Sequence, residues 1–153
     1  MLVSHGYLAL KLVHVLLAIV GVGFTSSFGV ILALAAPKPA VMPHALAICR
    51  HLERVAAPCF FGLFFTGLAL GRLGNVPLST PWFAGSIALQ LVAAALATVV
   101  LRPTMARQLA LFTEPTPPTK EEVRRLGARQ RFAGLVMTAI SVTLVALMVF
   151  KPT

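Results

Sequence analysis

Charged residues are scarce in this chain of 153 residues, and acidic residues are the scarcest among them. Only 11% of the residues are charged, and four of these are acidic, whereas 58% are hydrophobic. About a quarter of the residues in a soluble domain are charged, so this composition excludes a soluble globular protein. Several apolar runs reach the roughly 20 residues needed to cross a hydrocarbon layer of about 30 Å. The sequence therefore predicts a multi-pass integral membrane protein.

Cysteine is also scarce, with only two residues in the chain. Cys49 and Cys59 are ten residues apart on one predicted helix. A helix separates residues at that spacing by about 15 Å, which is too far for a disulfide between them. The sequence contains neither a C-x-x-C nor an H-x-x-x-H spacing, so it lacks the common patterns of a preformed metal site.

Proline and short polar stretches divide the chain into four predicted helices. The predicted ranges are residues 7–36, 43–72, 81–102 and 120–150. Proline interrupts a helix but suits its first turn. The first helix is therefore expected to stop at Pro37-Lys38-Pro39. The third is expected to begin at Pro81-Trp82 and to end at Arg102-Pro103.

The fourth predicted helix has a recognisable start signal. Thr119 followed three residues later by Glu122 predicts a capping box. An extended, proline-rich linker is expected just before it, at residues 114–118. The predicted fold class is an all-α membrane protein, an up-down four-helix transmembrane bundle that forms a single domain of residues 1–153.

Basic residues are distributed unevenly between the two predicted sides of the membrane. One side holds the two termini and the loop between the second and third helices, and outside the helices it carries only Arg72 and Lys151. The other side carries Lys38, Arg50, Arg54, Arg102, Arg107, Lys120, Arg124, Arg125, Arg129 and Arg131. The positive-inside rule makes that side cytoplasmic and places both termini outside. The net charge of +9 is thereby assigned to contacts with anionic membrane lipid and not to nucleic acid.

Each predicted helix carries polar side chains near its outer end, including Thr143 and Ser141 on the fourth, at about 10 and 14 Å by helix rise. At a rise of 1.5 Å per residue, Lys11 and His14 lie about 6 and 10 Å below the outer surface. Thr66 lies at about 8 Å, Ser86 at about 6 Å and Gln90 at about 12 Å by the same measure. This shared depth predicts one pocket in the outer half of the membrane, lined by Lys11, His14, Thr66, Ser86 and Gln90.

Two interpretations of these residues stay open. An ionisable residue inside a membrane is by default a functional-site hypothesis, and an apolar pocket with a few hydrogen-bonding groups suits a quinone. The pocket is thus expected to hold a quinol, a haem b bound by His14, or copper bound by His14. In the structural interpretation, His14 only forms a hydrogen bond between helices and Lys11 reaches the membrane surface. A bis-histidine haem on His14 is not expected within one subunit, since His44 and His51 lie about 20 Å or more below His14.

Small residues recur at the four-residue spacing that brings membrane helices together. The predicted ridges are Gly21, Thr25 and Gly29; Gly62 and Thr66; Gly67 and Gly71; and Gly134 and Thr138. They predict close packing of the helices within one bundle.

Several short motifs resemble those of an uncharacterised bacterial family of predicted four-helix integral membrane proteins. They are Lys11-x-x-His14, Arg50-x-x-Glu53-Arg54, Thr66-Gly67 and Pro81-Trp82. This resemblance implies a multi-pass protein of the bacterial cytoplasmic (inner) membrane. More distantly, the first helix is similar to those of copper-resistance D proteins and of the four-helix haem b protoporphyrinogen oxidase, which implies that His14 binds haem. The oxidase family also uses a lysine in its third helix, which this chain lacks, and that departure argues against protoporphyrinogen oxidation.

Three functions follow as hypotheses. The first is a small redox or electron-transfer subunit with a haem b or quinol site in the outer half of the membrane. The second is a non-catalytic accessory subunit that packs against a larger membrane complex, or a homo-oligomer. The third is copper handling.

The predicted orientation can be tested with single cysteines in a variant that lacks Cys49 and Cys59. A membrane-impermeant thiol reagent should label cysteines at either terminus in intact cells. It should label the loop between the third and fourth helices only after permeabilisation, since that side carries most of the basic residues. Labelling of that loop in intact cells would reverse the orientation.

Overall fold

Four long apolar helical spans make up the protein. The computed structural model describes residues 5–112 and 119–151. The spans are α1 (His5–Ala35), α2 (Met42–Leu73), a third span composed of α3 (Pro81–Ala95), η2 (Leu96–Leu101) and α4 (Arg102–Ala110), and α5 (Lys120–Phe150). A short 3₁₀ turn, η1 (Pro39–Val41), precedes α2. Each span is long and apolar enough to cross a membrane, which confirms the predicted all-α four-helix transmembrane bundle. The predicted linker at residues 114–118 lies outside the described residues.

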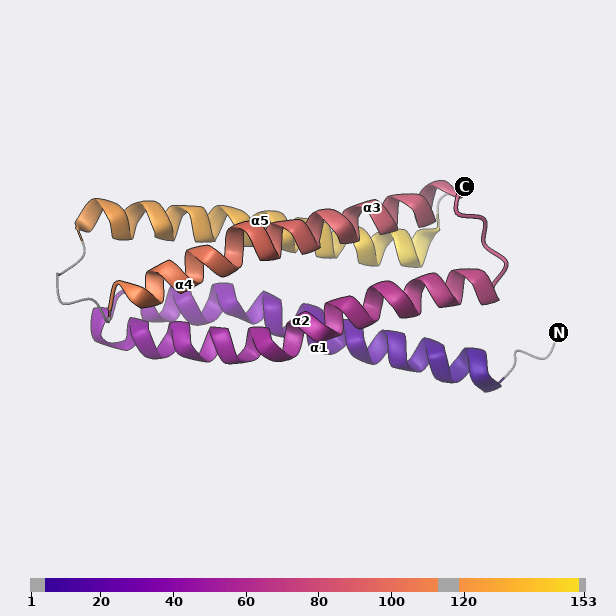
Figure 1. The fold of residues 1–153 in the computed structure, drawn as a ribbon, viewed down its shortest axis with the longest axis horizontal. Helices are drawn as coiled ribbons and strands as arrows, with labels where there is room; N and C mark the ends of the chain where they lie inside the picture. The colour runs from indigo at the N-terminus through magenta and orange to yellow at the C-terminus, as the bar shows by residue number, and fades with distance from the viewer. Residues whose placement is uncertain (1–4, 113–118, 152–153) are drawn as a thin grey trace.

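Successive spans run in opposite directions, so that the start of α1 and the end of α5 lie at the same end of the bundle (Figure 1). We call this the terminal end. The opposite end, where α1 connects to α2 and α4 precedes α5, carries most of the arginines and lysines. We call it the basic end. The arrangement confirms the up-down connectivity.

The third span extends further than expected. Its predicted end at Arg102-Pro103 is wrong, because the helix continues to Ala110. The backbone widens into a π-helical turn at η2, where the N–H of Arg102 donates to the carbonyl of Ala97, five residues earlier. Pro103 then falls in the first turn of α4, a position where a missing N–H is tolerated. The wide turn thus lets the helix pass a proline that would otherwise stop it.

The start of α5 confirms the predicted capping box in part. The backbone N–H of Glu122 donates to Thr119 Oγ1 over 3.2 Å. The Glu122 carboxylate is not used to complete the box. It lies 2.9 Å from the Arg107 guanidinium instead, and this ion pair joins α5 to α4.

The glycines of the predicted ridges fall into two groups: some pack closely against a neighbouring helix, and others have no neighbour. A methyl group on Gly21 would lie 3.3 Å from Cβ of Cys59, and one on Gly62 would lie 2.9 Å from the Leu17 side chain. The predicted close packing is therefore confirmed between α1 and α2. It is wrong for Gly29 and Gly134, where an added methyl group would have no neighbour within 4 Å.

These contacts give a bundle made of two tight pairs. Packing is closest between α1 and α2 and between the third span and α5, and it is looser from one pair to the other. Two apolar clusters hold the elements together. Cys49 and Met105 belong to the cluster between α2 and α4, and Ala93 and Met137 to the cluster between α3 and α5. The looser packing between the pairs leaves room for cavities.

Candidate functional site

His14 forms a hydrogen bond from α1 to α2. Its Nδ1 lies 2.7 Å from Thr66 Oγ1, and the same hydroxyl lies 2.6 Å from the carbonyl of Gly62. A hydroxyl has one proton, and the carbonyl can only accept it. Nδ1 therefore carries the proton of the neutral ring and donates to Thr66. The other ring nitrogen, Nε2, is left with a free lone pair.

A glycine makes this contact sterically feasible. A methyl group on Gly67 would lie 3.2 Å from Cε1 of His14, so a larger residue would press against the ring. The adjacent Thr66 and Gly67 thus supply a hydrogen-bond acceptor and the space for the imidazole. Of the five predicted site residues, His14 and Thr66 are brought into direct contact.

The other three predicted site residues lie elsewhere. Lys11 is exposed on α1. Ser86 is buried, but its hydroxyl donates to the carbonyl of Trp82 in its own helix over 2.7 Å. Gln90 reaches from α3 to α2, where its Nε2 donates to the carbonyl of Phe60 over 3.1 Å. Equal depth did not bring the five side chains together, because they face different directions around their helices.

Gln90 lines a cavity of about 250 Å³ between α2 and the third span, and we call it the α2–α3 cavity. The other four predicted residues are not among its lining residues. Its walls are mainly apolar. They include the phenylalanines Phe60, Phe61, Phe64 and Phe65 of α2 and the alanines Ala93, Ala94 and Ala97 of the third span. The Phe-Phe-Gly-Leu-Phe-Phe sequence at 60–65 was the available signal for this wall.

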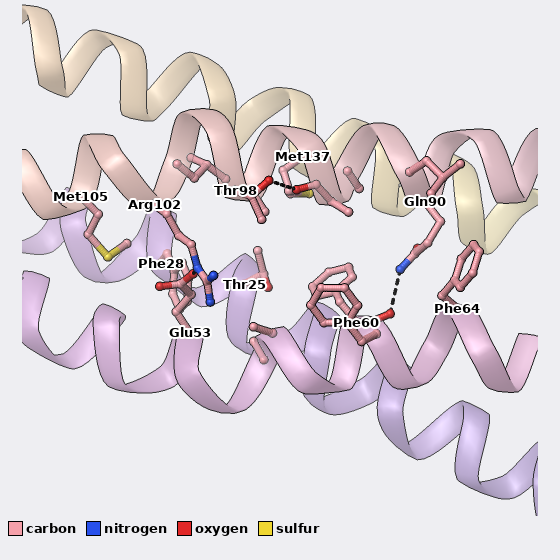
Figure 2. A pocket seen from close by; sticks show the side chains of 18 of the residues that line it. Thr25, Phe28, Glu53, Phe60, Phe64, Gln90, Thr98, Arg102, Met105 and Met137 are labelled. Atoms are coloured by element: carbon pink, nitrogen blue, oxygen red, sulfur yellow. Dashed lines mark hydrogen bonds and ion pairs between the residues drawn. The ribbon is translucent and has the colours of Figure 1, made fainter.

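Polar groups lie toward both ends of the α2–α3 cavity, as Figure 2 shows. At one end, the Gln90 amide reaches Phe60. At the other, Arg102 pairs with Glu53. The two ends are about 18 Å apart, the rise of the twelve residues between Gln90 and Arg102. The cavity is thus a slot that extends from the level of Gln90 toward the basic end.

The Glu53–Arg102 ion pair joins α2 to the third span. The continuation of the third span through η2 into α4 carries Arg102 along the bundle wall beside α2. Both side chains also line the cavity, so a cavity ligand would meet a charged group at this end.

The described residues offer a haem or metal few ligands. His14 Nε2 can serve as one axial ligand, and Thr66 would hold the ring in the tautomer that a metal requires. His14 lines neither the α2–α3 cavity nor the second large cavity between α1 and α5. Across residues 5–112 and 119–151, no group of three or more His, Cys, Asp or Glu side chains could hold a metal ion. Copper on His14 therefore stays a prediction that rests on a single residue.

The His14–Thr66 bond predicts a specific pattern of stabilities in detergent. His14→Leu should insert and fold, because the Thr66 hydroxyl keeps its bond to the Gly62 carbonyl. Thr66→Val leaves the His14 N–H without an acceptor, and should lower the free energy of unfolding by about 1 kcal/mol. When Thr66→Val is added to the His14→Leu variant, the further loss in the free energy of unfolding should be clearly smaller than in the wild type. Lys11→Ala, at an exposed position, serves as the control and should change nothing.

Thermal unfolding of the four variants and the wild type would measure this coupling. If Thr66→Val destabilised the wild type and the His14→Leu variant equally, the His14–Thr66 bond would not contribute to stability.

Comparison with known proteins agrees with the membrane architecture. No curated protein and no solved structure matches the chain, so the distant similarity to copper-resistance D proteins and to protoporphyrinogen oxidase stays a prediction. A match does exist at the level of protein families, and it covers nearly the whole chain. Residues 8–152 match the family described as Predicted integral membrane protein (DUF2269), and this chain, with its four apolar spans, belongs to that family of multi-pass membrane proteins.

Proposed function

We propose that the protein binds the ring of a quinone or quinol in the α2–α3 cavity and acts as a small redox subunit of its membrane. One observation carries this proposal. A mainly apolar cavity between α2 and the third span has an amide side chain toward one end and an ion pair toward the other.

The end of the slot at Gln90 matches the chemistry of a quinone ring. Such a ring is flat and apolar apart from two opposed oxygens, and the rings of Phe60 and Phe64 supply aromatic surface beside it. One ring is much shorter than the distance from Gln90 to Arg102, so the ion pair closes the far end of the slot and does not contact the same ring. The Gln90 amide can donate to a quinone carbonyl or accept from a quinol hydroxyl. The volume of about 250 Å³ falls just below the range of about 300–1,000 Å³ typical of ligand pockets. It therefore suits a ring, with an apolar tail extending into the surrounding lipid.

This proposal modifies the site inferred from residue depth. Gln90 remains, at about 14 Å from the start of α3 by its rise of nine residues. Lys11, Thr66 and Ser86 are left out, since none of them lines the slot. The phenylalanines of α2 and the Glu53–Arg102 pair take their places.

Filling the slot tests the proposal. Ala94 lines the cavity, whereas its neighbour Ala95 is exposed and does not. Ala94→Leu should lower the affinity for a short-chain quinone by tenfold or more, because the added side chain occupies the ring site. Ala95→Leu should bind as the wild type does. Gln90→Leu should weaken binding roughly fivefold, the effect of about one hydrogen bond.

Titration calorimetry on purified protein would give these affinities, and solvent extraction would give the amount of quinone that co-purifies. Undiminished binding by Ala94→Leu would refute the proposed site. If no quinone binds and the protein co-migrates with other subunits on native gels, the accessory-subunit hypothesis takes precedence.

A haem b on His14 is the second candidate. Its support is the free lone pair on Nε2, which follows from the bond between Nδ1 and Thr66. Since His14 lines neither cavity, the haem would have to lie against the outer surface of the α1–α2 pair. Purified protein should then show a Soret band, or develop one when haem is added, and His14→Leu should abolish it. Identical spectra for wild type and His14→Leu would remove this candidate.

A further inference from the structure

A second, larger cavity lies between α1 and α5, with α4 beside it. Its volume is about 390 Å³, and we call it the α1–α5 groove. Gly29 of α1 and Gly134 of α5 both line it, and a methyl group on either would have no neighbour within 4 Å. Further lining residues, such as Ala33 and Leu135, are exposed. The groove is therefore open to the lipid around the bundle.

Two amide oxygens in this groove have no hydrogen-bond partner in the described part of the chain. Gln130 is only 8% exposed, yet its Oε1 has no partner in the described part of the chain, and the same holds for Gln108 Oε1. Leaving a buried polar atom without a hydrogen-bond partner is unfavourable. An amide oxygen can only accept a hydrogen bond, so these groups call for a ligand that carries donors.

The two threonine hydroxyl groups that line the groove already have hydrogen-bond partners within their own helices. Thr25 Oγ1 donates to the carbonyl of Gly21 over 2.7 Å, and Thr138 Oγ1 donates to that of Gly134 over 3.0 Å. With these groups satisfied inside their own helices, the surface between them is effectively apolar. The groove thus has a polar part at Gln108 and Gln130 and an apolar part that extends toward the terminal end.

A positive charge stands beside the polar part. Arg131 lines the groove and is exposed, and its Nη1 lies 3.5 Å from the position of a methyl group on Gly127. Its guanidinium therefore lies back along α5 toward the basic end. The acidic residues that the structure describes, Glu53, Glu121 and Glu122, pair with other arginines. Arg131 is thus available to an anion, and its geometry suits a phosphate.

We propose that the α1–α5 groove is a specific site for one phospholipid whose headgroup carries both a phosphate and free hydroxyl groups. Arg131 binds the phosphate, and the hydroxyl groups donate to the orphaned amide oxygens of Gln108 and Gln130. An acyl chain lies along the apolar part past Gly29 and Gly134. The rise from Gln130 to Ser141, which also lines the groove, is about 16 Å.

The charge arrangement favours this ligand over others. A water-soluble anion would leave the apolar part of the groove uncovered. A phospholipid without headgroup donors would leave the two amide oxygens unsatisfied. The groove adjoins the α2–α3 cavity, and Gln130 lines both. Gly29, Arg131 and Gly134 line the groove alone, so variants at these three positions test lipid binding separately from quinone binding.

Native mass spectrometry of delipidated protein can test the site with three lipids that share the same acyl chains. Phosphatidylglycerol has the phosphate and the hydroxyl groups, phosphatidylcholine lacks the donors, and diacylglycerol lacks the phosphate. Phosphatidylglycerol should bind at least fivefold more tightly than either of the others, because each lacks one set of hydrogen bonds. Gln130→Leu should reduce its affinity to about that of phosphatidylcholine.

Matched variants separate this site from general lipid contact. Gly134→Leu should fill the groove and lower phosphatidylglycerol affinity tenfold or more. Gly23→Leu, at an exposed glycine with equally open surroundings outside both cavities, should not. Arg131→Gln should weaken binding, whereas Arg129→Gln, at an exposed position outside the groove, should leave it unchanged. Should Gly134→Leu fold poorly, Gly29→Leu fills the same space from the opposite wall.

Two results would overturn the proposal. One is equal binding of the three lipids by the wild type. The other is full retention of phosphatidylglycerol by both groove-filling variants. Either would show that the groove is an ordinary lipid-facing surface.

Discussion

A helix in hydrocarbon has no water with which to form hydrogen bonds, so every polar group on it must find a partner within the protein or in a ligand. This protein meets the constraint mostly within single helices. The hydroxyl groups of Thr25, Thr66, Ser86, Thr98, Thr104, Thr138 and Thr143 each donate to the carbonyl four residues earlier. Serine and threonine in these spans can therefore be buried at little cost in free energy. Their presence alone does not indicate a binding site.

Polar side chains that cannot form a hydrogen bond within their own helix are better indicators of a binding site. His14 uses a neighbouring helix and Gln90 uses a backbone carbonyl across the bundle. Gln108 and Gln130 retain buried oxygens without a partner in the described residues. All four lie between spans and not within one. Both proposed ligand sites are anchored on such residues, because a ligand supplies the hydrogen bonds that their own helices cannot.

The cavities follow from how membrane helices attract one another. Without a hydrophobic driving force in lipid, close packing depends on van der Waals contact, which small residues permit. Gly21 and Gly62 meet side chains of the partner helix, and α1 and α2 pack tightly around them. Gly29 and Gly134 are equally small, but no side chain of another helix packs against them. The bundle is thus two tight pairs with cavities of about 250 and 390 Å³ between them, and the Glu53–Arg102 ion pair joins the two pairs toward the basic end.

The four spans, their alternating direction and the lengths of the first, second and fourth could be predicted from the sequence, because hydropathy and helix rise depend only on the order of residues along the chain. The depth of His14 and Thr66 followed from the same count. Other features depended on how the helices turn and approach one another. Ser86 lies near the depth of Thr66 but bonds to its own helix, and η2 carries the third span past Pro103 to Ala110. Depth is a single coordinate set by residue number, whereas the direction of a side chain and the gap between two helices are set by packing, and these decided which residues share a cavity.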